Sequence, residues 1–476
     1  MRGPASANWA LGALLLLSAP ACLGAAPPAP AVDIVPKPRI IERLGGGVPF
    51  SPGESAIRFA LRDTADVVPA VDEICATAAA LFGAPPAIGR AAKFTVWVGV
   101  PGTDAAFDKA CRAGGVAPAR RLGQEGYALR ISRRSVLIAA RSPRGAFYGL
   151  QSLNQLLRAS HARRGILPLV RIIDWPVLRV RAVMDDISRG PVPNSAYMRQ
   201  QIRRLAELKV NALTYYTEHV VATRSHPEFA PPDGAVSVDE WKAIAAFARR
   251  YHIDLIGNFQ SFGHFDRILA TPRYAPLAEG KSLLSPAFGE SYRLLDDIYR
   301  EMVPAFTAPW FHVNCDETFD LGRGASGRLV DSLGKGRVYL AHLMKLREML
   351  KPLGMRMLVW GDMLLENPGV IDLLPRDVVI ATWTYDSLAD FRKFISPFQS
   401  RGFDVLVAPG ILNSYSVMPN FRVALPNIAR FVAEGIRQGV LGAMTTVWDD
   451  GGTAQFARDW YGVAYAAERM WSGDAA

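Results

Sequence analysis

The alternation of hydrophobic and polar residues changes character near residue 178. From there on, short runs rich in β-branched and aromatic residues alternate with longer segments in which apolar residues recur every three or four positions. The first pattern indicates strands and the second indicates amphipathic helices. We count eight such runs, at residues 180–186, 212–216, 254–259, 310–314, 357–360, 378–382, 404–407 and 442–446. Eight consecutive strand–helix units predict an α/β fold, a closed (β/α)8 TIM barrel over residues 177–476.

The residues before the barrel follow a different, mixed order. Helices are expected at residues 67–82, where Gly83 closes the segment, and at residues 145–158. The β-rich runs in this part of the chain are 94–100, 127–131 and 136–140. Strands and helices mixed in this way predict a smaller α+β domain, which we assign to residues 40–176.

The N-terminus has the pattern of an export signal. Residues 1–26 combine a charge at Arg2, a short apolar core and small residues suited to cleavage, and the Ala/Pro-rich residues 27–39 follow as a linker. The protein is therefore expected to be exported, to the periplasm or beyond. Cys22 stands in a poor lipoprotein acceptor sequence, which makes a lipid anchor the less favoured alternative. Since no later stretch is apolar over the length of a bilayer, no integral membrane segment is expected.

Charge and cysteine content change this picture little. The chain has 54 Lys and Arg against 44 Asp and Glu, a net charge of +10. Its basic pairs, such as Arg203–Arg204 and Arg249–Arg250, are scattered over predicted helix surfaces, so we expect no nucleic-acid partner. Cys75 and Cys111 fall in the same predicted domain. Export would permit a disulfide between them, and the sequence leaves that pairing open.

Polar and aromatic residues gather directly after the predicted barrel strands. Because a TIM-barrel active site is built at the carboxyl ends of the strands, these residues should share one mouth. They are Asp186, Arg189, Glu218, His219, His264, Asp316, Glu317, Trp360, Asp362, Trp383, Tyr385, Asn413, Tyr415, Trp448, Asp449 and Asp450. Aromatic rings pack on the apolar faces of a sugar while charged groups bind its hydroxyls, so this set favours a carbohydrate ligand. The histidines show no metal-ligand spacing, and neither a phosphate loop nor a nucleophile elbow stands out.

Two adjacent carboxylates, Asp316 and Glu317, follow the fourth predicted strand and precede a glycine-rich stretch. They could merely cap a following helix, but their position at a strand end favours catalysis. The paired carboxyl groups of an ordinary retaining glycosidase lie about 5–5.5 Å apart across the scissile bond. Two carboxylates that are adjacent in sequence fit that arrangement poorly. Adjacency suits one proton donor beside one orienting anion better. His312, earlier on the strand, is expected to be a core histidine.

Several short motifs together carry a family resemblance. They are residues 145–153 (GAFYGLQSL), 186–189 (DISR), 263–264 (GH), 312–317 (HVNCDE), 360–362 (WGD) and 448–450 (WDD). In this order, over residues 126–471, the chain resembles glycoside hydrolase family 20, the β-N-acetylhexosaminidases. The resemblance implies removal of terminal β-linked N-acetylhexosamine from a glycan, with retention and without a metal or cofactor. In this family the substrate's own acetamido group is the nucleophile.

The resemblance also implies a role for each matching residue. Glu317 would be the general acid and base, Asp316 would orient the acetamido group, and His264 with Glu218 would form a polar relay behind them. Arg189 and Asp450 would hold ring hydroxyls, and Trp360, Trp383 and Trp448 would form the pocket walls. Asp362 and Asn413 are expected to contact substrate as well. Tyr415 is the candidate for the acetamido oxygen, with Tyr385 as its rival.

The sequence departs from the family pattern at three places. Glu218-His219 stands where many members have two aspartates, Val417 replaces an acidic residue, and Asp450 replaces a glutamate. The choice between gluco and galacto substrates therefore stays open. Two other functions remain as alternatives: another barrel glycosidase, such as an α-glucuronidase, and a sugar-binding protein without turnover. The intact Asp316–Glu317 pair speaks against the second.

Overall fold

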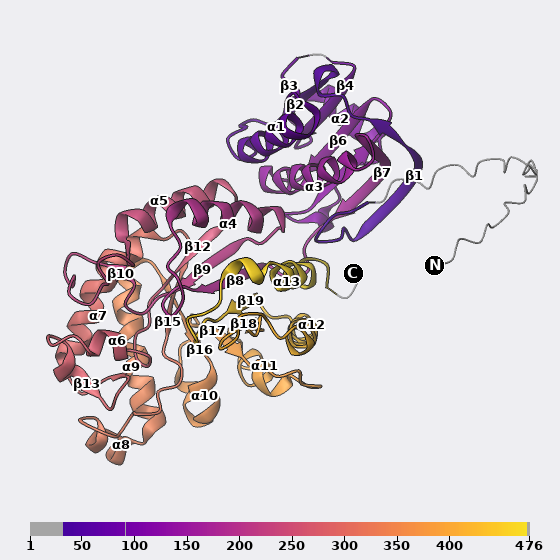
Figure 1. Ribbon diagram of the computed structural model, residues 1–476. Helices are drawn as coiled ribbons and strands as arrows, with labels where there is room; N and C mark the ends of the chain where they lie inside the picture. The colour runs from indigo at the N-terminus through magenta and orange to yellow at the C-terminus, as the bar shows by residue number, and fades with distance from the viewer. Residues whose placement is uncertain (1–31, 91, 474–476) are drawn as a thin grey trace, which may run out of the picture.

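The computed structural model describes residues 32–90 and 92–473 and shows two domains, an N-terminal α+β domain and a barrel (Figure 1). The expected export signal, Cys22 and the first part of the linker lie outside the described residues. Within those residues, no helix combines the length and apolar character needed to cross a bilayer.

The N-terminal domain is built on one seven-stranded mixed sheet. Its strand order is β1-β7-β5-β6-β4-β2-β3. The strands are β1 (Ile40–Pro49), β2 (Ser55–Ala60), β3 (Ala87–Ile88), β4 (Phe94–Gly99), β5 (Tyr127–Ile131), β6 (Ser135–Ala140) and β7 (Ile166–Asp174). Helices α1 (Val68–Phe82) and α3 (Pro143–His161) pack against each other, and α2 (Ala105–Ala113) packs on β6. Gly83 ends α1 with a φ of 85°, as the sequence predicts.

The cysteines of this domain do not pair. Cys75, on α1, packs against the large core that includes Ile57 and Val96. Cys111, on α2, belongs to a separate cluster with Phe107 and Leu137. Because side chains alternate between the two faces of a strand, these clusters lie on opposite sides of the sheet. Both cysteines are free thiols, so Cys75 and Cys111 form no disulfide.

The second domain is the predicted closed barrel of parallel strands. The order around it is β12-β15-β16-β17-β18-β19-β8-β9. The strands are β8 (Val180–Asp186), β9 (Ala212–Tyr216), β12 (Asp254–Asn258), β15 (Trp310–Asn314), β16 (Arg356–Trp360), β17 (Val379–Trp383), β18 (Asp404–Ala408) and β19 (Gly442–Val447). Each agrees with its predicted range to within one residue at either end, so the fold class is confirmed.

Helices surround the barrel and leave the carboxyl ends of the strands open. They are α4 (Ser195–Glu207), α5 (Val238–Arg250), α6 (Asp266–Leu269), α7 (Gly289–Met302), α8 (Gly327–Leu333), α9 (Lys335–Leu350), α10 (Asp362–Glu366), α11 (Arg392–Gln399), α12 (Phe421–Gln438) and α13 (Trp460–Ser472). Two-stranded pairs, β10 (Val221–Ala222) with β11 (Val236–Ser237) and β13 (Ala278–Glu279) with β14 (Leu283–Leu284), interrupt the loops. A capping box begins α5, in which Ser237 is the N-cap and Glu240 closes the box.

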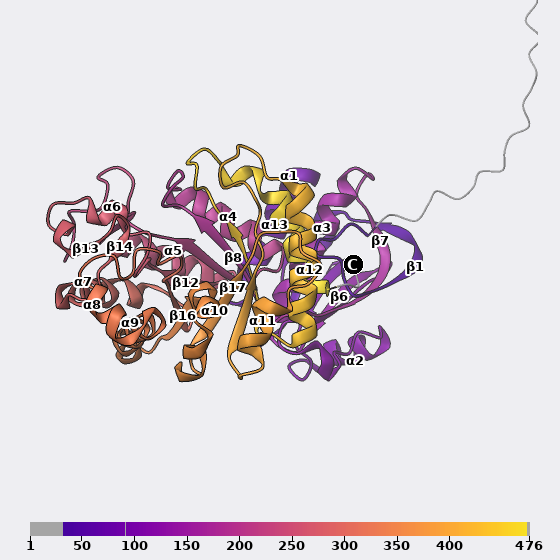
Figure 2. The ribbon, with the colours of Figure 1, turned by 90° about the horizontal axis from the view of Figure 1, so that it is seen from below.

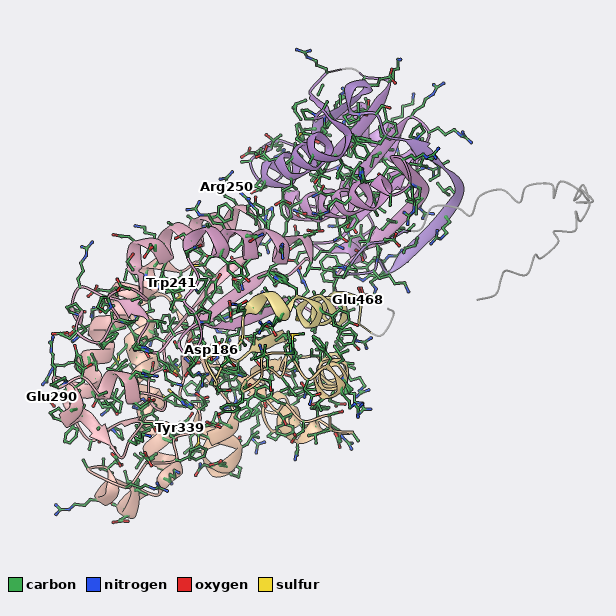
Figure 3. All side chains as sticks on the ribbon, in the orientation of Figure 1. Asp186, Trp241, Arg250, Glu290, Tyr339 and Glu468 are labelled. Atoms are coloured by element: carbon green, nitrogen blue, oxygen red, sulfur yellow. The ribbon has the colours of Figure 1, made fainter. Side chains whose placement is uncertain are left out.

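The barrel interior is filled by side chains, so it is not a channel. Met184, Ile256, Leu358 and Met444 are fully buried there and form one cluster. Inward-pointing layers of this kind leave room for a ligand only above the strand ends. Asp186, which ends β8, lies in the middle of the barrel domain in Figure 3.

The N-terminal domain is attached near the opposite, amino-terminal ends of the strands. Arg181, at the start of β8, is buried and donates from Nη1 to Glu125 at 2.8 Å. Trp471 of α13 donates to Asp174, at the end of β7, at 2.8 Å. Figure 2 shows α13 beside α3, where the rings of Tyr148 and Trp471 are 5.4 Å apart. The N-terminal domain therefore contacts the barrel on the side of the strand amino termini and leaves the mouth at the carboxyl ends free.

Candidate active site

A cavity of about 280 Å³ opens at the carboxyl ends of the barrel strands. Its walls come from the carboxyl ends of seven of the eight strands and the loops that follow them, and β16 is the exception. The lining residues are Arg189, Tyr216, His264, Asp316, Glu317, Trp383, Tyr385, Ser414, Tyr415, Trp448 and Asp450. We call this the mouth cavity.

The chain turns sharply where β15 ends. Asn314, Cys315 and Glu317 have φ values of 59°, 63° and 50°, in the left-handed region that side-chain-bearing residues rarely adopt. His264, on the facing loop, has a φ of 49°. The neighbouring Gly263 permits this close approach, because a Cβ there would lie 2.6 Å from the carbonyl oxygen of Asp316. Such concentrated backbone strain is typical of functional sites, where it fixes side chains that an unstrained turn would point elsewhere.

His264 lies between the two adjacent acids. Its Nε2 is 3.6 Å from Oδ2 of Asp316 and 3.4 Å from Oε2 of Glu317. Burial lowers the pKa of His264, but its hydrogen bonds and charge interactions with the acids outweigh burial and raise that pKa to about 11. The ring is therefore a cation at neutral pH.

Asp316 is held as a buried anion. Its Oδ1 accepts a hydrogen bond from Nε2 of Gln260 at 3.0 Å. Burial alone would raise the pKa of Asp316, but hydrogen bonds from His264 and Gln260 and the charge of His264 keep it below its ordinary value. The same Gln260 amide also donates to the hydroxyl of Tyr216 at 3.2 Å. Asp316 is thus fixed from two sides.

Glu218 stands one step further back along this chain of hydrogen bonds. It accepts from the Tyr216 hydroxyl at 2.9 Å, and its backbone nitrogen donates to Ser188 at 2.8 Å. Burial raises the pKa of Glu218 to about 7, against the opposing charge of Arg189. Glu218 does not line the mouth cavity, so the structure places it behind Tyr216.

Glu317 is the more accessible of the two acids, with 37% of its side chain exposed. Its backbone nitrogen donates to Oδ2 of Asp362 at 3.0 Å. Burial and the charge of Asp316 raise the pKa of Asp362 to about 7. Asp362 therefore positions the backbone of Glu317, whereas the sequence predicted a contact with substrate.

Arg189 is fixed by two aspartates. Its Nε donates to Asp186 at 2.8 Å, and its Nη1 lies 2.6 Å from Oδ1 of Asp450. The guanidinium also lies 4.9 Å from the ring centres of Tyr216 and Trp448. The remaining N–H groups of Arg189 and the free oxygen of Asp450 form a donor and acceptor set at the cavity wall.

Aromatic side chains form another part of the cavity wall. The rings of Trp383 and Tyr385 stack, with centres 5.3 Å apart. Trp448 donates from Nε1 to the hydroxyl oxygen of Tyr385 at 2.5 Å. Tyr415 also lines the cavity but is 81% exposed, at its outer edge. The two rival tyrosines therefore differ: Tyr385 is fixed inside and Tyr415 stands at the rim.

Two residues that the sequence predicted to contact substrate do not line the mouth cavity. Trp360 is completely buried under the cavity, where its Nε1 donates to Asn314 at 3.1 Å. Asn413 is buried and donates to Asp459 at 3.2 Å, in a neighbouring cavity. Trp360 is the last residue of β16 and packs in the barrel interior, whereas Asn413 lies in the loop after β18. The cavity beside Asn413 is also lined by Asp185, Asp186, Asp449 and Asp459, and we call it the acid cavity. His312 is buried, and burial lowers its pKa to about 3, as suits a core histidine.

Three residues of the site were missed from the sequence. Tyr216 and Ser414 line the cavity, and Gln260 holds Asp316. Tyr216 ends β9, so the rule that strand ends supply site residues could have found it. Gln260 and Ser414 also follow predicted strands, but an uncharged polar residue in a loop is too common to single out. The described residues also contain no group of three or more His, Cys, Asp or Glu side chains arranged to hold a metal ion.

Two family models match this chain. The model "Glycosyl hydrolase family 20, domain 2" covers residues 31–175, and "Glycosyl hydrolase family 20, catalytic domain" covers residues 199–474. The chain belongs to glycosyl hydrolase family 20. The first match ends just before β8, the first barrel strand, and the second begins within α4.

Relatives of this family 20 member are distant. A beta-hexosaminidase of Porphyromonas gingivalis is 27% identical over 238 residues, which are 43% of this chain and 30% of that protein. Beta-hexosaminidase 1 of Coccidioides posadasii is 23% identical over 60% of this chain and 53% of its own length. The chain thus spans about a third to a half of these two relatives. The alpha subunit of rat beta-hexosaminidase is 21% identical over 74% of this chain and 71% of its own length.

Solved structures share the fold. Flavobacterium johnsoniae chitobiase superimposes with a TM-score of 0.75 at 17% identity, covering 93% of this chain and 70% of that one. An exo-beta-N-acetylglucosaminidase of Vibrio harveyi, solved in complex with N-acetylglucosamine, gives a TM-score of 0.72 at 20% identity, covering 93% and 74%. These likenesses concern the arrangement of the domains and the barrel.

Proposed function

We propose that this protein is a retaining exo-β-N-acetylhexosaminidase that uses the acetamido group of its substrate as nucleophile. The observation that carries the proposal is the projection of Asp316 and Glu317 into one cavity, with the His264 cation between them. Of the described residues that line the cavity, the other carboxylate is Asp450, which is paired with Arg189. The wall thus offers a proton donor and an orienting anion, and the nucleophile is left to the ligand.

In the first step, Glu317 donates its proton to the glycosidic oxygen as the bond from that oxygen to C1 breaks. The carbonyl oxygen of the 2-acetamido group forms a new bond to C1 on the opposite face, giving a cyclic oxazolinium ion. Asp316, already held as an anion, accepts a hydrogen bond from the acetamido N–H and stabilises the positive charge that develops there. His264 keeps this carboxylate ionised and fixed.

In the second step, Glu317 is a carboxylate and acts as the base. It removes a proton from water while the water oxygen attacks C1, and the bond from C1 to the acetamido oxygen breaks. Two displacements at C1 give the product the configuration of the substrate. The side chain of Glu317 is exposed enough to meet both the leaving group and the incoming water.

Recognition of the sugar is assigned to the charged and the aromatic residues that line the cavity. Arg189 and Asp450 are placed to bind ring hydroxyls, and the faces of Trp383 and Trp448 offer an apolar surface for the ring. The Tyr385 hydroxyl accepts a hydrogen bond from Trp448 and lines the cavity, where its O–H can donate to the acetamido carbonyl oxygen. We therefore prefer Tyr385 to the exposed Tyr415 for that contact. A cavity of about 280 Å³ suits a single terminal sugar.

We also propose that the protein acts after export, on glycans outside the cytoplasm. The support is the charge, apolar core and small residues of positions 1–26. N-terminal sequencing of protein purified from the exported fraction of the producing cell would test this. A mature N-terminus close to residue 26 is expected, and an intact Met1 would contradict it.

A substrate panel tests the activity. Aryl β-glycosides of N-acetylglucosamine, N-acetylgalactosamine and glucose, and an aryl α-glucuronide, should be compared with the wild-type protein and with Asp316→Asn. Turnover is expected for the two N-acetyl sugars and not for the others, with a large loss in Asp316→Asn. Turnover of the glucuronide alone would instead support a glucuronidase.

A further inference from the structure

Strand β13 ends in Glu279, a carboxylate that is completely buried. Five hydrogen bonds satisfy its oxygens. The backbone nitrogens of Gly322, Ser326 and Gly324 donate to it at 2.9, 3.1 and 3.3 Å. The hydroxyls of Ser285, at 2.8 Å, and of Ser326 also donate to it. Because each of these bonds is costly to break in a buried site, the carboxylate and its donors are fixed together.

Four of the five donor groups come from one segment, residues 320–326, which we call the glycine loop. This loop begins three residues after Glu317. Its glycines permit the close contact with Glu279. Gly322 has a φ of 94°, and a Cβ on Gly324 would lie 3.1 Å from Cγ of the glutamate. The glycine-rich stretch after the two adjacent acids is therefore shaped to wrap a buried carboxylate.

The hairpin formed by β13 and β14 also holds the loop that carries His264. The backbone nitrogen of Leu284 donates to the carbonyl of Phe262 at 2.9 Å. On the other side of His264, the backbone nitrogen of Phe265 donates to the carbonyl of Ser282 at 2.8 Å. The hairpin therefore joins the loop of His264 to the glycine loop.

The backbone on both sides of this connection is strained. His264 and Glu317 have φ values of 49° and 50°, and such positions persist only where the surrounding structure fixes them. Their side chains meet at 3.4 Å in the mouth cavity. A second link strengthens the connection, because Asp320 of the glycine loop accepts a hydrogen bond from the backbone nitrogen of Lys281 at 3.0 Å. The hairpin thus acts on both partners of the contact between His264 and Glu317.

We propose that Glu279 is a positioning residue, which sets the place of the Glu317 carboxyl group through the glycine loop. This inference rests on the proposed function, in which Glu317 is the proton donor. Glu279 does not line the mouth cavity, so it acts without touching substrate. The residues assigned to the sugar, such as Arg189, Trp383 and Asp450, come from β17 and from the loops after β8 and β19. Loosening Glu279 should therefore impair proton transfer more than sugar binding.

The test compares two leaving groups by kcat/KM, which reports the first bond cleavage. Phenolate leaves poorly and needs the proton of Glu317, whereas dinitrophenolate leaves without one. In Glu279→Gln, an NH₂ group replaces one acceptor oxygen and faces the backbone N–H donors. The value for the phenyl β-N-acetylglucosaminide should fall about tenfold relative to the dinitrophenyl one, part of the roughly 10²–10⁴-fold that a general acid contributes. Inhibition by N-acetylglucosamine should stay within a few-fold of wild type.

Two serines provide a milder, matched pair if Glu279→Gln folds poorly. Each donates one hydroxyl hydrogen bond to the same carboxylate, Ser326 from the glycine loop and Ser285 from the end of the hairpin. Ser326→Ala should lower the ratio of the phenyl to the dinitrophenyl value about threefold, the effect of losing one hydrogen bond. Ser285→Ala leaves the glycine loop attached and should keep the wild-type ratio.

The outcomes separate this inference from the proposed function. Equal losses for the two glycosides in Glu279→Gln would mean a general loss of folded protein and would overturn the positioning role. So would equal ratios in Ser326→Ala and Ser285→Ala. A wild-type protein that hydrolyses neither glycoside would instead overturn the proposed function, and this inference with it. If wild type hydrolyses both, the variants decide the role of Glu279 alone.

Discussion

The two neighbouring cavities place buried carboxylates in opposite circumstances. In the mouth cavity, Asp316 has a cation and an amide beside it, and its pKa is lowered. In the acid cavity, Asp459 has only the amide of Asn413, and its pKa is raised to about 8. Both side chains are buried. Burial alone therefore does not decide the charge of a carboxylate in this barrel, and the partner supplied by the neighbouring loop does.

The same contrast extends to geometry. His264 reaches Asp316 and Glu317 only because four backbone positions adopt left-handed φ values around them. The acid cavity shows no comparable strain, since its described lining residues are absent from the non-glycine positions with positive φ. Strain at the first site indicates a fixed catalytic arrangement.

The largest expected effect comes from removing the proton donor on the mouth-cavity side. Glu317→Gln should lower kcat/KM for an aryl β-N-acetylglucosaminide by about 10²–10⁴-fold, the usual contribution of a general acid or base. Steady-state kinetics give the number. Glu290→Gln, on the exposed surface of α7, is the control and should match wild type. Wild-type rates in Glu317→Gln would show that the mouth cavity is not the catalytic site.

His264→Gln should leave Asp316 buried without a neighbouring cation, as Asp459 is in the acid cavity. Glutamine keeps a hydrogen-bond donor but loses the charge, so the pKa of Asp316 should rise. We expect kcat/KM to fall by about 10²-fold. The acidic limb of the pH profile should move to higher pH, because Asp316 becomes protonated earlier as the pH falls. A lower rate with an unmoved limb would mean that His264 has only a packing role.

Arg189→Lys tests the binding wall with a smaller effect. Lysine keeps the charge but cannot contact Asp186 and Asp450 together through a planar fork. Loss of about one charge-assisted hydrogen bond to the sugar should raise KM roughly tenfold and leave kcat within a few-fold. A fall in kcat with an unchanged KM would contradict the assignment of Arg189 to ring hydroxyls.

The smallest effect concerns stability on the acid-cavity side. The pKa of Asp459 is 3.8 in the unfolded chain and about 8 when folded, so the folded protein holds a proton that the unfolded chain releases between these values. Its contribution to stability is therefore lost as the pH rises from about 4 to about 8. Asp459→Asn does not titrate and should be more stable than wild type at pH 8.5, by about 1 kcal/mol. Thermal unfolding at pH 5 and pH 8.5 measures the difference, and an equal difference at both values would refute it.

Much of the fold was predictable because the signals were local. The eight barrel strands are short β-rich runs separated by amphipathic helices, and Ser237 and Gly83 mark a helix start and a helix end. The residues directly after β15 were likewise predictable, since strand ends supply barrel sites.

The remainder depends on how loops bend in three dimensions. Asn413 and Ser414 are adjacent in sequence, yet one lines the acid cavity and the other the mouth cavity. Asp362 follows its strand like Asp316 but turns beneath Glu317 to hold its backbone. Gln260 matters through a hydrogen bond across 56 positions of the chain, which no local pattern encodes.

The central claim is that the ligand supplies the nucleophile beside Asp316 and Glu317. It is tested most directly by kcat for aryl β-glucosaminides whose 2-acetamido group is replaced by its trifluoroacetamido analogue. Fluorine withdraws electrons from the carbonyl oxygen and weakens its attack on C1. Our account predicts a fall in kcat by orders of magnitude, and an unchanged kcat would contradict it.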